Sequence, residues 1–208
     1  MESLHSVMFL LVSCLGGLRG FEVMWTDLAA LRYDVNYCND LDDQTGVSWP
    51  VVGRFKSRNG ILDCYMIPIA ATTDSGIRFM SWTQRFLARL EHEWHTDGWA
   101  FKRANGDRAK ASDYRKNIFS KLETIQATTT LLDPDCDIWD DYGIQRSGRR
   151  FLNTRCINMK VSKLDIELQM RWSTDRANGV RTVVRSMLHT YAEVRNMIGS
   201  LIRPSKVY

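Results

Sequence analysis

The chain has 208 residues, of which 44% are hydrophobic and 25% are charged. This balance is typical of a folded globular protein and excludes a disordered chain, and the length suits one large domain or two small ones. Charge is uneven, because residues 1–142 hold 15 Lys and Arg against 20 Asp and Glu, whereas residues 143–208 hold 13 against 4. The last third is therefore the expected face for a polyanion, with a merely basic pair of surface helices as the alternative.

Cysteine and histidine spacing does not favour a metal site or disulfides. The five cysteines are odd in number and form no CxxC, which fits a reducing, intracellular compartment. His92 and His95 lie one residue closer than the HExxH pair that binds zinc, and we expect both on the surface of a helix. The apolar run 7–18 has no Lys or Arg before it and is too short to span a bilayer, so it predicts a buried helix and no membrane attachment.

The first half of the chain predicts helices followed by a hairpin. Apolar spacing indicates a helix over 3–15 that ends at Gly16-Gly17, and a second helix from Arg19 to Leu31. The Asn- and Asp-rich residues 35–47 predict a loop. Two strands are expected on either side of the turn sequence Asn59-Gly60, namely Val51 to Phe55 and Ile61 to Ile69.

The second half predicts mostly helix. Amphipathic helices are expected over 77–95 and 111–126, an extended segment over 99–101, and a loop or short helix over the acidic residues 133–141. Further helices are expected over 145–159, from the capping sequence Ser162–Asp165 to about Met170, and over 183–202, with a polar loop at 173–181. Because no repeat or linker is visible, we expect one mainly α (α+β) domain over 1–208, with a small antiparallel sheet.

Five short motifs follow one another along the chain. They are Gly17-Leu18-Arg19-Gly20-Phe21-Glu22, Gly53-Arg54-Phe55-Lys56, Arg146-Ser147-Gly148-Arg149, Trp172 and Tyr191. Their order, and the 23 residues from Arg149 to Trp172, resemble the catalytic domain of the tyrosine recombinases, also called phage-type integrases. The Gly-Arg-Phe-Lys and Arg-Ser-x-Arg-Arg sequences resemble those of a divergent branch of the family that is found in eukaryotic genomes and mobile elements. The resemblance covers nearly the whole chain.

The chain departs from the family pattern at three places. Arg146 stands where the family has His or Lys. Tyr191 follows Trp172 by 19 residues, which is longer than in bacterial members and makes 173–182 look like an insertion. Gly148 replaces a bulky apolar residue, and a glycine inside a helix costs about 1 kcal/mol against alanine. We therefore expect weaker packing there, and reduced or lost activity is one reading.

The resemblance implies an enzyme that cuts and rejoins DNA without a metal or other cofactor. Arg19 and Arg149 would hold the scissile phosphate, because a guanidinium fork donates two hydrogen bonds and stays charged. Arg146 would add a third positive charge. Tyr191 would attack the phosphorus to form a 3′-phosphotyrosyl link, and Lys56 would protonate the departing 5′ oxygen.

Other residues take supporting roles in this scheme. Trp172 has an indole N–H that would bond the phosphate or support the nucleophile. Glu22 would support the helix that holds Arg19. Contacts to the DNA backbone are expected from Arg150, Arg155 and Arg171.

Three functions stay open at this point. The first is a site-specific recombinase or integrase of a mobile element, the second a non-catalytic DNA-binding remnant, and the third a type IB topoisomerase-like enzyme that works as a monomer. The resemblance also implies double-stranded DNA as partner, a nuclear location in a eukaryote, and a tetramer on DNA. The apolar residues 197–202 would dock on a neighbouring copy or on their own domain. The amino-terminal core-binding domain of the family is expected to be absent.

Overall fold

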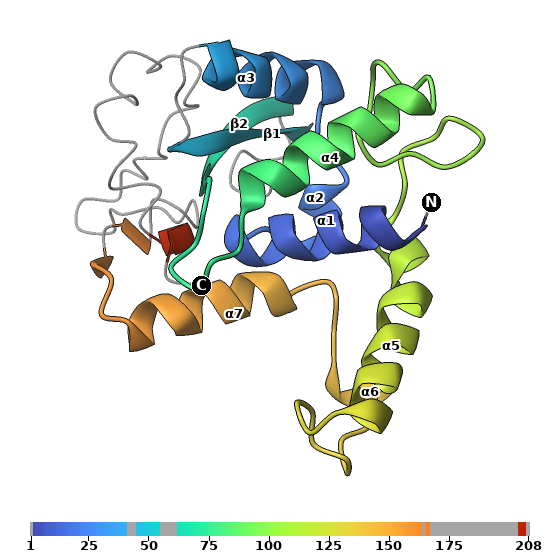
Figure 1. Ribbon diagram of the computed structural model, residues 1–208, viewed down its shortest axis with the longest axis vertical. Helices are drawn as coiled ribbons and strands as arrows, with labels where there is room; N and C mark the ends of the chain where they lie inside the picture. Colours follow the sequence, from blue (N-terminus) through green and yellow to red (C-terminus); the bar gives the residue numbers. More distant parts are fainter. Residues whose placement is uncertain (1, 41–44, 55–61, 164, 167–203, 207–208) are drawn as a thin grey trace.

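The computed structural model describes residues 2–40, 45–54, 62–163, 165–166 and 204–206 (Figure 1). This part of the chain is mainly helical and contains a two-stranded antiparallel sheet. Its elements in chain order are α1 (Glu2–Leu15), α2 (Gly20–Val23), α3 (Leu28–Asp40), β1 (Gly46–Arg54), β2 (Leu62–Ala70), α4 (Phe79–His92), α5 (Ala111–Thr128), α6 (Ile138–Asp141) and α7 (Ser147–Asn158).

The single helix expected from Arg19 to Leu31 is wrong, because the chain turns between α2 and α3. Thr26 ends the first helix: its Oγ1 donates to the Val23 carbonyl at 2.7 Å and accepts from Trp49 Nε1 at 2.7 Å. Asp27 then begins α3, with its carboxylate accepting the Ala30 N–H at 2.8 Å. Such side-chain bonds compete with helix continuation and favour helix starts.

The loop expected over 35–47 is also wrong over most of its length. α3 continues to Asp40 and β1 already begins at Gly46. Val35 continues the buried apolar stripe of α3, and the Asp34 carboxylate accepts the Ser48 N–H at 2.8 Å. Packing on the sheet therefore overrides the weak helix propensity of Asn and Asp in this segment.

The remaining described elements agree with the expectations in kind. α1, α4, α5 and α7 fill four expected helices, α6 lies within the acidic stretch, and β1 pairs with β2 from Gly46–Ala70 to Arg54–Leu62. Trp99 forms an isolated bridge to Asp27, as an extended segment would. Ser162 Oγ accepts the Asp165 N–H at 3.1 Å. The expected turn at Asn59-Gly60, the expected loop at 173–181 and the expected helix over 183–202 lie outside the described residues.

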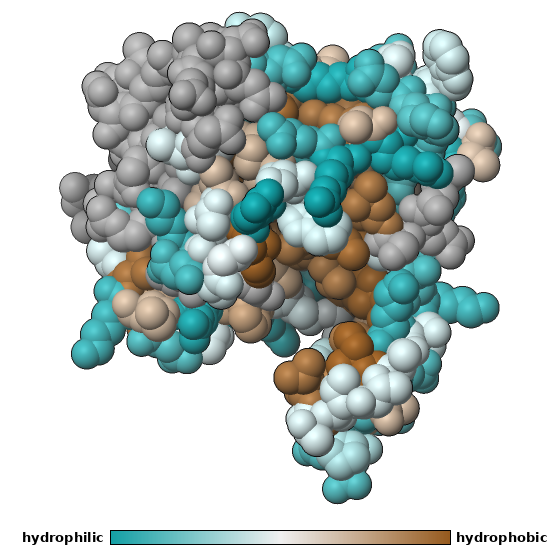
Figure 2. Space-filling view, viewed as in Figure 1, coloured by the Kyte–Doolittle hydropathy of each residue, from teal (hydrophilic) through white to brown (hydrophobic). Residues whose placement is uncertain are grey.

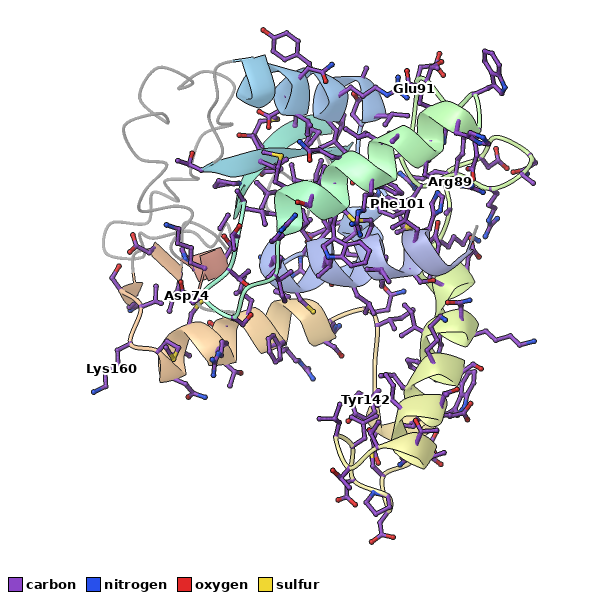
Figure 3. The ribbon with its side chains drawn as sticks, viewed as in Figure 1. Asp74, Arg89, Glu91, Phe101, Tyr142 and Lys160 are labelled. Atoms are coloured by element: carbon purple, nitrogen blue, oxygen red, sulfur yellow. The ribbon has the colours of Figure 1, made fainter. Side chains whose placement is uncertain are left out.

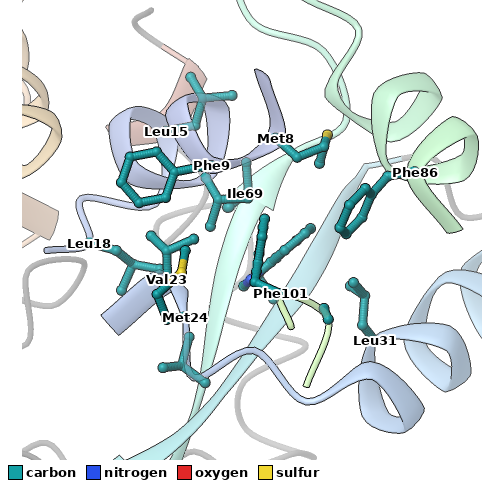
Figure 4. Packing of buried hydrophobic residues seen from close by; sticks show 14 of the residues in the cluster. Met8, Phe9, Leu15, Leu18, Val23, Met24, Leu31, Ile69, Phe86 and Phe101 are labelled. Atoms are coloured by element: carbon teal, nitrogen blue, oxygen red, sulfur yellow. The ribbon is translucent and has the colours of Figure 1, made fainter. Parts of the chain in front are cut away.

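One apolar core joins the sheet to the helices around α1 (Figure 4). Most apolar residues of α1 are buried, as the apolar run 7–18 predicts, and the helix lies between α7 on one side and the sheet and α4 on the other (Figure 1). No helix in the described ranges combines the length and apolar character needed to cross a bilayer. The core residues drawn together in the close view include Met8, Phe9, Leu15, Leu18, Val23, Met24, Leu31, Ile69, Phe86 and Phe101.

An arm made of α5, α6 and the loop between them projects from this body (Figure 1). The first part of α5 packs on the body, where Tyr114 stacks on Phe9. The outer part is held by contacts within the arm: Gln126 Nε2 donates to the carbonyls of Asp133 and Cys136 at 2.7 and 2.8 Å, and Trp139 Nε1 donates to Glu123 at 2.6 Å. Apolar residues show among polar ones on the arm (Figure 2). Its exposed large apolar side chains are Ile125, Leu131, Trp139 and Tyr142.

The two histidines near the end of α4 differ in their surroundings. His92 is exposed as expected, but His95 lies beyond the helix and is only 4% exposed. Its carbonyl accepts from Arg32 Nη2 at 3.1 Å. Burial, helped by the positive charge of Lys102, holds the pKa of His95 below its ordinary value. The expectation of a surface position is therefore wrong for His95.

Candidate functional site

Two motif arginines that lie 130 residues apart in the sequence meet at one buried carboxylate. Glu22 Oε1 lies 3.1 Å from Arg19 Nη1 and 3.5 Å from Arg149 Nη1. The other carboxylate oxygen, Oε2, accepts the backbone N–H of Arg19 at 2.8 Å. The Glu22 side chain is 3% exposed, that of Arg149 12% and that of Arg19 38%. Glu22 thus holds both arginines, and Arg19 keeps one side open to solvent.

A glycine brings the two arginine motifs together. The backbone N–H of Gly20, at the start of α2, donates to the Gln145 carbonyl at 2.9 Å. A Cβ on Gly20 would lie only 2.7 Å from the Ile144 carbonyl oxygen and 3.1 Å from the Ala111 Cβ. Only a residue without a side chain therefore allows the segment before α7 to cross α2 at this distance. The crossing places Arg146, the next residue, beside the start of α2.

Gly148 has the same role between α7 and α1. A Cβ at this position would lie 2.2 Å from Ser13 Oγ and 2.6 Å from the Ser13 carbonyl carbon. Gly148 is buried, and the two helix backbones approach closely there. The expected loss of packing at Gly148 is therefore wrong, because the absence of a side chain is what permits the contact. Arg149 is the next residue on α7, so the contact of Gly148 with Ser13 also fixes the position of the Arg149 backbone.

The amino-terminal end of α7 is suited to an anion. Arg146 precedes the helix without a side-chain cap, and the first turn contains no acidic residue. Backbone N–H groups and the helix dipole favour negative charge at such an end. Arg146, Arg150 and Arg155 are exposed, and Lys160 lies at the other end of the helix, away from the arm that carries Tyr142 (Figure 3). The basic side chains thus follow α7 along its length.

The other predicted site residues lie outside the described residues. These are Lys56, Arg171, Trp172 and Tyr191, and the apolar tail 197–202 lies there as well. The chain is described again at 204–206, where Ser205 Oγ accepts the Ala70 N–H at 2.8 Å and Cys156 Sγ lies 3.5 Å from the Pro204 carbonyl oxygen. Residues 204–206 therefore pack on their own domain, against β2 and α7.

Two buried groups near these elements are poor nucleophiles. Burial raises the pKa of the Cys156 thiol to about 11, and burial also raises the pKa of the Tyr114 hydroxyl. Both stay protonated at neutral pH. Within the described ranges, Cys14, Cys64, Cys136 and Cys156 are not joined in disulfides, and no three His, Cys, Asp or Glu side chains gather as metal ligands.

The sequence interpretation missed a basic loop between α4 and α5. Residues 102–110 contain Lys102, Arg103, Arg108 and Lys110. The backbones of Lys102 and Arg108 form an isolated antiparallel β-bridge across a turn that contains Gly106 at φ +87°. Averaging charge over the acidic residues 1–142 hid them. The available signal was Asn105-Gly106, a hairpin-turn dipeptide, between basic residues.

Comparison with protein-family models, with curated proteins and with solved structures gives no match to this chain.

Proposed function

We propose that this chain is a DNA breaking and rejoining enzyme of the tyrosine recombinase type. The observation that carries the proposal is the meeting of Arg19 and Arg149 at Glu22. The motif order predicted that these two arginines act on one phosphate, and a fold that kept them apart would have ruled this out. Support also comes from the uncapped start of α7 beside them.

The cluster suits a phosphate that gains negative charge during reaction. Two guanidinium groups held by one carboxylate need little rearrangement when a phosphodiester binds, so their orientation is set before the reaction. Removing one donor of this kind typically costs about 2.7–4 kcal/mol of transition-state stabilisation. Arg19 is the more exposed of the two, and it offers the side from which a duplex would approach.

The resemblance supplies the reacting groups. Tyr191 Oη forms a bond to phosphorus as the bond from phosphorus to the 5′ oxygen breaks. The phenol gives its proton to solvent, and Lys56 gives one to the departing 5′ oxygen, which leaves as a hydroxyl. The phosphodiester is replaced by a phosphotyrosyl ester, so the reverse step rejoins DNA without an energy source. Trp172 would donate its indole N–H within the same site.

Covalent trapping tests this proposal. The full chain is incubated with nicked duplexes whose sequence is randomised around the nick, and denaturant-resistant protein–DNA complexes are quantified. Wild type is expected to form the complex and Tyr191→Phe to lose it, whereas Tyr208→Phe, a matched removal of a second tyrosine hydroxyl, is expected to retain it.

Arginine variants add a geometric control. Arg149→Lys removes the guanidinium that lies beside Glu22 and is expected to slow complex formation by about 10²–10³-fold. Arg150→Lys makes the same chemical change at the exposed neighbour and is expected to have a small effect. DNA binding without any covalent complex would favour the non-catalytic remnant. Relaxation of supercoiled plasmid without exchange between two sites would favour the topoisomerase-like alternative.

A further inference from the structure

Arg108 in the basic loop lies over two tryptophan rings. Its guanidinium carbon is 3.5 Å from the ring centroid of Trp25 and 5.5 Å from that of Trp99. At 3.5 Å the guanidinium lies flat over the Trp25 ring, because an N–H pointing into the ring would hold the carbon farther away. Its N–H groups therefore point outward in the guanidinium plane, and the ring does not use them.

In the part of the chain that the structure describes, no carboxylate forms an ion pair with Arg108. Among the described residues, no side chain or carbonyl accepts a hydrogen bond from its guanidinium. Arg103 in the same loop is different, since it donates to both carboxylate oxygens of Asp113 at 2.7 and 2.8 Å. The loop thus holds Arg103, which is already paired, and Arg108, which lies over the tryptophans and has no acidic partner among the described residues.

The tryptophan beneath Arg108 is itself fixed. A Cβ on Gly53 would lie 2.6 Å from the Trp25 ring, so the strand backbone packs directly on one side of the indole. Val52 N–H donates to the Trp25 carbonyl at 2.8 Å. The guanidinium therefore lies on a rigid base made of β1 and the turn after α2, which lowers the entropy cost of a contact.

Arg108 also lies near the arginine cluster. It stands three residues before Ala111, whose Cβ would be 3.1 Å from a Cβ on Gly20, and Gly20 directly follows Arg19. Gly53, which also packs on the Trp25 ring, begins the Gly-Arg-Phe-Lys motif. Arg108 is thus placed between the first arginine motif and the strand that leads to the lysine motif.

We propose that Arg108 binds a phosphate of the DNA backbone next to the reacting one, with Trp25 and Trp99 holding its guanidinium flat. This assignment rests on the proposed DNA function, and it extends the binding face beyond the basic last third of the chain. A guanidinium fork pairs well with phosphate oxygens. A backbone contact of this kind adds affinity and register without reading sequence.

Salt-dependent binding tests the assignment. The affinity of the full chain for intact random-sequence duplexes is measured over a range of salt concentrations for wild type, Arg108→Ala and Arg103→Ala. One lost phosphate contact is expected to lower affinity about tenfold and to reduce the slope of log affinity against log salt by about 0.9. Arg103→Ala removes the same charge from the same loop and is expected to change the slope little, since Asp113 already occupies that arginine.

Two further measurements cover a folding defect in Arg108→Ala. Arg108→Lys is a smaller change that retains the positive charge. It is expected to keep the slope of log affinity against log salt while lowering the affinity. In wild type, duplex DNA is expected to protect Arg108, and not Arg103, from modification by phenylglyoxal, as read by mass spectrometry. Unchanged slope and no protection of Arg108 would mean that it only supports the tryptophans.

The outcomes separate this assignment from the enzyme proposal. If wild type forms the phosphotyrosyl complex and Arg108→Ala keeps wild-type affinity and slope, the Arg108 contact is wrong and the enzyme proposal stands. If Arg108→Ala reduces the slope but no phosphotyrosyl complex forms, the contact stands and the enzyme proposal fails. No measurable binding of wild type to any duplex would overturn the Arg108 contact.

Discussion

Replacement of Glu22 tests the arginine cluster independently of any reaction. Glu22→Ala leaves Arg149, whose side chain is 12% exposed, without its carboxylate. Breaking a buried ion pair by removing one partner costs about 3–5 kcal/mol. The link to Arg19, which is 38% exposed, adds less than about 1 kcal/mol because solvent screens it. At about 2–4 °C per kcal/mol for a domain of this size, the melting temperature is expected to fall by about 10 °C.

A second ion pair gives a matched control. Glu93 Oε1 lies 2.6 Å from Arg89 Nε, closer than either contact of Glu22, but Arg89 is 44% exposed. Glu93→Ala is therefore expected to lower the free energy of unfolding by less than about 1 kcal/mol. Urea unfolding followed by circular dichroism compares the two variants, and Glu22→Gln, which keeps an acceptor but no charge, is expected to fall between them. A Glu22→Ala loss no larger than that of Glu93→Ala would refute the burial argument.

Three further predictions concern packing and pH. Gly148→Ala is expected to destabilise the fold in thermal unfolding by at least about 1–3 kcal/mol despite its better helix propensity, because the new methyl meets the Ser13 backbone; stability equal to wild type would contradict this contact. Because burial holds the pKa of His95 below its ordinary value, the unfolded state takes up a proton more readily than the folded state, so the free energy of unfolding should fall as the pH drops below about 6.5. His95→Gln should flatten that dependence in urea titrations, and an unchanged slope would count against it. Ser205→Ala removes the buried acceptor of the Ala70 N–H and should cost about 1–3 kcal/mol in denaturant unfolding, whereas no loss would mean that water replaces the hydroxyl.

Motif order predicted the arginine cluster better than local pattern predicted the helices. Arg19 and Arg149 meet because glycines in their motifs allow backbone segments to pass close to each other. At Gly20, for example, a Cβ would lie only 2.7 Å from the Ile144 carbonyl oxygen. The helix expected from Arg19 to Leu31 failed because apolar spacing alone does not reveal that Thr26 bonds to Trp49. That bond joins residues far apart in sequence, and no window of local periodicity contains it.

Two misjudgements arose from reading a residue or a region without its neighbours. Gly148 was expected to loosen the site, whereas its meaning depends on Ser13 in another helix. Arg108 was overlooked because net charge was averaged over an acidic region, although its place over Trp25 sets it apart from Arg103. Both features are properties of tertiary contacts, which composition and spacing do not specify.

Mass spectrometry of a trapped protein–DNA complex tests the central claim most directly. The complex formed by wild type on nicked duplexes is digested with nuclease and protease, and the nucleotide-bearing peptide is sequenced. The proposal predicts a phosphate ester on Tyr191 joined to a 3′ nucleotide end, and a complex yield that falls about 10²–10³-fold in Arg149→Lys. A nucleotide on another residue, or no adduct on a protein that binds the same duplexes, would contradict it.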